Sequence, residues 1–86
     1  MDPTAELRIN RDIKVLATAK GLAIRLTFVV SGQQLDILHI KLSRAEAIQV
    51  GGDIAKDGSS NRIPIAFEPG AARAFGNWLV KFCEQA

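Results

Sequence analysis

The sequence predicts one small α+β domain over residues 1–86: an antiparallel meander of three strands, then a helix, a short edge strand and a C-terminal helix. Three observations predict this class. Apolar residues alternate with period two in the first half of the chain, a helix-capping motif follows, and the C-terminal segment has helical spacing. Both helices are expected on one face of the sheet, because a chain of 86 residues has room for one core.

The strongest strand signal lies over Leu22–Val30, where every second residue is large and apolar. Upstream, residues 12–20 have spacing that fits either a strand or a short helix. A strand is favoured, because a two-residue turn at Lys20-Gly21 pairs Ala19 with Leu22 and aligns the apolar residues of both strands on one face.

The apolar residues Leu7 and Ile9 extend the alternation of this strand toward the N-terminus. We therefore expect the strand to begin near Glu6, with a break or bulge near Asn10.

The third strand is predicted over Leu35–Leu42, and its register has two alternatives. A two-residue turn with Gly32 at its first central position would place Ile37 and His39 on the core face. A connection of odd length would instead place Leu38, Ile40 and Leu42 there. The odd connection is favoured, because burial of three aliphatic side chains contributes several kcal/mol and turn preference contributes less.

The first helix is predicted to begin at Ser43-Arg44-Ala45-Glu46, which matches the capping box of serine and a glutamate three residues later. The apolar spacing continues to Ala55 or Lys56. Inside this stretch, Gly51-Gly52 indicates either close approach to another element or a kink or end of the helix.

The last third of the chain predicts a short edge strand and a helix. Arg62–Phe67 alternates in hydrophobicity, and Pro64 restricts such a strand to a sheet edge because proline cannot donate a ladder hydrogen bond. Pro69 suits the first turn of the final helix. The predicted apolar face of that helix comprises Ala71, Phe75, Trp78, Leu79 and Phe82.

Composition argues against an enzyme. The net charge is +2, and the chain has one cysteine, Cys83, and one histidine, His39. These two cannot complete a zinc site of the usual ligand number, and they form a nucleophile pair only if the fold brings them together. We expect no catalytic residues, no metal and no cofactor.

The uncovered face of the sheet is the predicted interaction site. Apolar side chains mixed with polar ones on such a face can mark a partner or dimer surface. The expected function is a small protein–protein interaction module, of adaptor or inhibitor type, that binds another protein or itself as a homodimer through this face or the sheet edge. The predicted partner-binding residues are Arg25, Thr27, Val29, Ile37, His39 and Lys41.

The alternative function is weak, salt-sensitive nucleic-acid binding. The N-terminal half is mildly basic, and Arg8, Lys14, Arg25 and Lys41 could contact phosphates, although no aromatic residue accompanies them for base stacking. No membrane partner is expected, because the longest dense apolar stretch is far shorter than the ~20 residues of a span. The N-terminus has no signal-peptide pattern, so the expected location is cytoplasmic.

Overall fold

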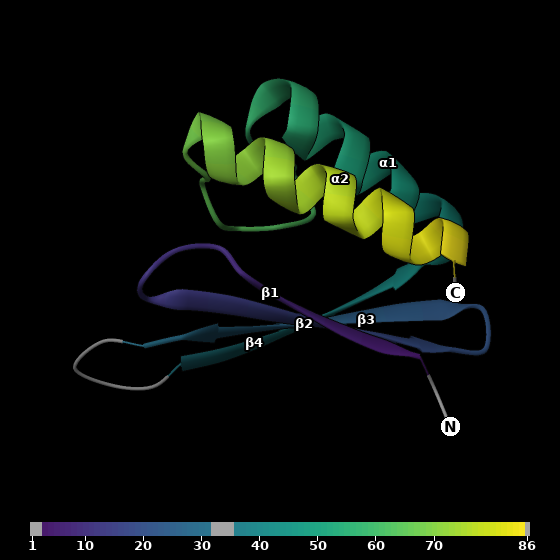
Figure 1. Cartoon of the computed structure of the whole chain (residues 1–86). Coiled ribbons are helices and arrows are strands. Elements are labelled where there is room, and N and C mark those ends of the chain that lie inside the picture. The colour runs from purple at the N-terminus through teal and green to yellow at the C-terminus, as the bar shows by residue number, and fades with distance from the viewer. Residues whose placement is uncertain (1–2, 32–35, 86) are drawn as a thin grey trace.

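The computed structural model describes residues 3–31 and 36–85 and has two layers (Figure 1). An antiparallel sheet in the order β1-β2-β3-β4 forms one layer, and two adjacent helices cover one of its faces. The elements are β1 (Thr4–Arg8), β2 (Ile13–Lys20), β3 (Ala23–Val30), β4 (Asp36–Ser43), α1 (Arg44–Asp57) and α2 (Pro69–Gln85). The predicted α+β class and the position of both helices on one face are confirmed.

The residues around Leu7 form a separate strand, so the expected upstream extension of β2 is wrong. β1 runs antiparallel to β2, with Leu7 opposite Val15. The reversal occurs at Asn10, whose side-chain oxygen accepts hydrogen bonds from the N–H groups of Asp12 and Ile13 at 2.8 and 2.9 Å. Asparagine favours turns through such bonds. The break expected near Asn10 is therefore a full change of direction.

The strand predicted over residues 12–20 is confirmed as β2, but the turn after it lies one residue later than predicted. Gly21 and Leu22 are the turn residues, and Ala19 pairs with Ile24 instead of Leu22. Gly21 has a φ of 63°, which suits the first central position of a type II′ turn. The register differs from the prediction by two residues, so the side chains that remain in the two strands keep their predicted faces. The expectation for Leu22 is wrong, because this residue lies in the turn before β3 and is 86% exposed.

The register between β3 and β4 confirms the odd-length connection. Val30 pairs with Asp36, and Phe28 lies opposite Leu38. Leu38, Ile40 and Leu42 therefore lie on the face that the helices cover. The turn proposed at Gly32 falls outside the described residues, but the register it would impose is wrong.

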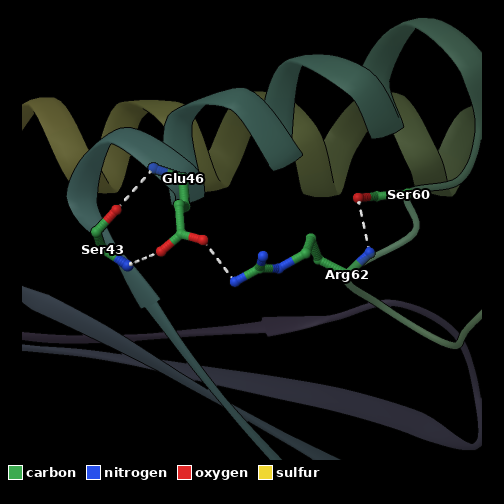
Figure 2. Close-up of polar contacts among 4 residues, drawn as sticks. All are labelled: Ser43, Glu46, Ser60 and Arg62. Carbon is green, nitrogen blue, oxygen red and sulfur yellow. Dashed lines mark hydrogen bonds and ion pairs between the residues drawn. The ribbon is translucent and has the colours of Figure 1, made fainter.

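The first helix, α1, begins at the predicted capping box (Figure 2). The hydroxyl of Ser43 accepts the N–H of Glu46 at 3.1 Å, and the Glu46 carboxylate accepts the N–H of Ser43 at 3.0 Å. The helix continues through Gly51-Gly52 to Asp57, and Gly58 caps it in the left-handed conformation with a φ of 80°. The alternative of a kink or end at the two glycines is wrong.

The segment Arg62–Phe67 is extended, but the edge strand predicted there is wrong. Its burial alternates as expected, with Ile63 buried and Phe67 half-buried. Ile63 belongs to the core and Phe67 packs against it. The backbone of this segment runs beside the helices and lies outside the plane of the sheet (Figure 1). Its described backbone hydrogen bonds are local, from Ile63 to Ser60 and from Phe67 to Gly58. Alternating burial here arises without pairing to a neighbouring strand.

The second helix, α2, begins at Pro69 as predicted and joins the layers. The ring of Phe75 is fully buried, with its centroid 5.8 Å from that of Phe28 in the sheet and 5.0 Å from that of Phe67. The two helices meet closely at Gly51, where a Cβ atom would lie 2.9 Å from the carbonyl oxygen of Gly76. The close-approach interpretation of Gly51 is therefore confirmed.

Candidate interaction surface

The face of the sheet opposite the helices is open to solvent (Figure 1). Strand pairing arranges its side chains in four cross-strand rows. The rows are Arg8–Lys14–Val29–Ile37, then Glu6–Leu16–Thr27–His39, then Thr4–Thr18–Arg25–Lys41, and finally Lys20–Ala23–Ser43. The period-two geometry of a strand causes this grouping, because the intervening residues point into the core.

All six residues predicted to bind a partner lie on this open face. Arg25, Ile37, His39 and Lys41 are exposed, and Thr27 and Val29 are half-buried. They form three adjacent cross-strand pairs between β3 and β4, and the hydroxyl of Thr27 lies 3.2 Å from Nδ1 of His39. The structure thus brings the predicted set together on two neighbouring strands.

Aliphatic side chains form a small patch at one end of the face. Val29 lies directly opposite Ile37, and Leu16 is diagonal to Val29 through the Leu16–Thr27 pair. Ile37 is 55% exposed, which makes it one of the largest exposed aliphatic side chains of the described residues. Water is therefore in contact with apolar surface that a partner could cover.

The open face is strongly cationic, and the helical layer is not. The face carries five cations (Arg8, Lys14, Lys20, Arg25 and Lys41) and one carboxylate, Glu6, a net charge of +4. Residues 44–85, which include both helices, contain five basic and five acidic side chains. The basic character of the chain is thus a property of one face.

The cations lie in two groups. Arg8 and Lys14 lie at the end near the aliphatic patch, and Nζ of Lys14 forms an ion pair with Glu6 at 3.3 Å. At the other end, Lys20, Arg25 and Lys41 line an open hollow of about 400 Å³ together with Thr18 and Ala23. No acidic side chain lines this hollow.

Sequence reasoning missed Lys20 as a member of the face. The predicted turn includes Lys20, whereas in the structure Lys20 is the last residue of β2 and pairs with Ala23. The signal was present in the alternation, since Lys14, Leu16, Thr18 and Lys20 follow one another at period two.

The fold separates the two residues considered for nucleophilic chemistry. His39 is exposed on the open face of β4, and Cys83 is buried in α2 on the other side of the sheet. Burial raises the pKa of the Cys83 thiol, and the nearby Arg44 cation opposes this rise. Arg44 also donates a hydrogen bond to the backbone carbonyl of Cys83, so this region joins α1 to α2.

Residues 3–31 and 36–85 contain no group of three or more His, Cys, Asp or Glu side chains placed to hold a metal ion. Neither α1 nor α2 has the length and apolar composition needed to cross a bilayer.

No protein-family model, curated protein or solved structure matches this chain.

Proposed function

We propose that this protein is a non-enzymatic interaction module whose open sheet face binds an acidic surface of another protein. The observation that carries the proposal is the combination on one uncovered face of an exposed aliphatic patch with five cations and a single carboxylate. Interfaces commonly have an apolar centre and a polar rim, and charge complementarity guides their orientation. The proposal includes the cytoplasmic location expected above.

A second protein fits this face better than a second copy of the same chain. Face-to-face pairing of two copies would bring two surfaces of net charge +4 together, and their repulsion opposes association. A homodimer that avoids this repulsion would pair the exposed edges of β4, which is an end strand of the sheet.

The test is affinity capture from nuclease-treated native lysate, followed by cross-linking and mass spectrometry. The variant Ile37→Glu places a carboxylate in the aliphatic patch. Ile48→Glu on α1 is the matched control, because Ile48 is also an exposed isoleucine, 38% exposed against 55% for Ile37. We expect Ile37→Glu to reduce capture of a discrete protein about tenfold or more, and Ile48→Glu to leave capture unchanged.

The cross-links decide whether the captured protein fits the proposal. The supporting result joins Lys14, Lys20 or Lys41 to a partner segment rich in Asp, Glu or phosphorylated residues. Equal capture by wild type and both variants, or cross-links only to the helices, would contradict the proposal. If sedimentation equilibrium shows self-association that depends on β4, the partner is a second copy of this chain and the protein is a homodimer.

Nucleic-acid binding is the second candidate, and the cationic open face is the observation that favours it. The four strand rows of the face contain no Phe, Tyr or Trp for base stacking, since Phe28 points into the core, and His39 is their one ring side chain. Binding would then depend on phosphate contacts, and its affinity would fall steeply with salt. A salt titration with single- and double-stranded oligonucleotides tests this candidate, and absence of binding at low salt excludes it.

A further inference from the structure

We propose that the hollow lined by Thr18, Lys20, Ala23, Arg25 and Lys41 binds a phosphomonoester dianion. The inference rests on the proposed function, because it assigns this dianion to a phosphorylated side chain of the protein partner. We call these five residues the cationic hollow.

Strand pairing builds the cationic hollow from three neighbouring strands. Thr18, Arg25 and Lys41 lie side by side in one cross-strand row of β2, β3 and β4. Lys20 and Ala23 belong to the next row, and the small side chain of Ala23 leaves space between the longer ones. Three cations and one hydroxyl therefore border the same open volume.

These cations have no charge partner in the part of the chain that the structure describes. The two ion pairs there join Lys14 to Glu6 and Arg62 to Glu46, and neither involves the hollow. Arg25 lies directly opposite Lys41, and like charges in this arrangement destabilise a sheet. Local destabilisation of this kind is typical of functional sites, and a bound anion would remove it.

The number and type of donors favour a phosphomonoester over a carboxylate. A phosphomonoester carries a charge of about −1.5 to −2 at pH 7 and three strong acceptor oxygens. The Arg25 guanidinium can donate two parallel hydrogen bonds, the two lysines supply point charges, and the Thr18 hydroxyl supplies a further donor. A single carboxylate would neutralise only one of the three cations.

The distribution of charge disfavours a nucleic-acid backbone. A phosphodiester chain needs cations along a continuous track. Here the cationic hollow is separated from Arg8 and Lys14 by the row Glu6–Leu16–Thr27–His39, which contains the only carboxylate of the four strand rows. The two cation groups therefore do not form one track.

The test is a titration of the ¹⁵N-labelled protein with phenyl phosphate, followed by NMR at pH 7.5 and constant ionic strength. We expect amide shifts to concentrate at Thr18, Lys20, Arg25 and Lys41. Binding should weaken for diethyl phosphate and acetate, which carry one negative charge each. The variants Arg25→Gln and Lys41→Gln should each raise the Kd for phenyl phosphate about fivefold, whereas Lys81→Gln on α2 should not change it.

Three results would overturn the inference. They are shifts spread evenly over all surface lysines, equal binding of phenyl phosphate and diethyl phosphate, and an oligonucleotide that shifts both cation groups and displaces phenyl phosphate.

Failure of this inference differs from failure of the proposed function. If Ile37→Glu abolishes binding of the protein partner and Arg25→Gln leaves it unchanged, the proposed interaction module stands and the phosphate site is rejected. Phosphate binding at the cationic hollow without any protein partner would retain the anion site and reject the interaction module.

Discussion

Glu46 joins the start of α1 to the connection before α2 through one side chain. Its carboxylate accepts the N–H of Ser43 at the start of α1 and forms an ion pair with Arg62, whose own N–H donates to the Ser60 hydroxyl (Figure 2). The hydrogen bond from the Ser43 backbone is the main cause that lowers the pKa of Glu46 below its ordinary value of 4.5, and Arg62 adds to it. The residue therefore couples the helix start to the connection before α2.

The lowered pKa predicts the pH range in which the Glu46 charge stabilises the fold. A carboxyl whose folded pKa lies below its unfolded value contributes fully above the unfolded pKa, and the contribution disappears as pH falls through the folded pKa. The variant Glu46→Gln keeps a capping-box acceptor but removes the charge. We expect it to be less stable than wild type above about pH 5, with the difference vanishing at lower pH.

Urea unfolding of both proteins at several pH values measures this difference in free energy. The variant Glu68→Gln is the control, because Glu68 is an exposed carboxyl with no ion pair among the described contacts. A stability gap between wild type and Glu46→Gln that stays constant down to pH 3 would contradict the electrostatic role.

At the scale of elements, two adjacent glycines of α1 have different environments. A Cβ on Gly51 would lie 2.9 Å from both the Gly76 carbonyl oxygen and a methyl group of Val80, whereas a Cβ on Gly52 would meet no atom within 4 Å. Gly51 therefore sets the distance between α1 and α2, and Gly52 faces open space.

This contrast predicts opposite effects for the same substitution at neighbouring positions. Gly52→Ala should stabilise the protein by about 0.5–1 kcal/mol, because alanine is the better helix former. Gly51→Ala should destabilise it by about 1–2 kcal/mol, since overpacking exceeds the gain in helix propensity. Thermal or urea unfolding measures both values. If both substitutions stabilise the protein, α1 and α2 can move apart at Gly51 without a loss of stability.

At the scale of the whole molecule, Phe75 connects the sheet, the extended segment and α2. Its ring lies beside Phe28 of β3, Phe67 of the extended segment and Trp78 of its own helix, with centroid distances of 5.8, 5.0 and 5.9 Å. A chain of this size has a thin core, so one central aromatic side chain accounts for a large share of its stability.

Removal of this ring should affect the entire fold. We expect Phe75→Ala to lower the free energy of unfolding by about 3–5 kcal/mol, through lost burial and the cavity that remains. Arg73→Ala on the exposed side of α2 is the control, with an expected change within about 0.5 kcal/mol. Urea unfolding followed by Trp78 fluorescence measures both. Equal urea midpoints for wild type and Phe75→Ala would show that the packing of the helices on the sheet does not depend on Phe75.

Local features of this protein follow from its amino-acid sequence alone. The starts of α1 and α2 depend on residues within one turn, so Ser43, Glu46 and Pro69 were sufficient to predict them, whereas the end of α1 at Asp57 lies beyond the predicted Ala55 or Lys56. The faces of the strands were also predictable, because side chains alternate at period two. A turn misplaced by one residue at Gly21 therefore left Arg25, Thr27 and Val29 on their predicted face.

Features that join distant segments depend on the packing of the whole chain. Alternation in Arg62–Phe67 indicates extended backbone, but only the position of the helices shows that Ile63 packs into the core without strand pairing. The cationic hollow likewise joins Lys20, Arg25 and Lys41, which come from three strands. Their meeting depends on the register and the turns, and these follow from the packing energy of the whole core rather than from any local pattern.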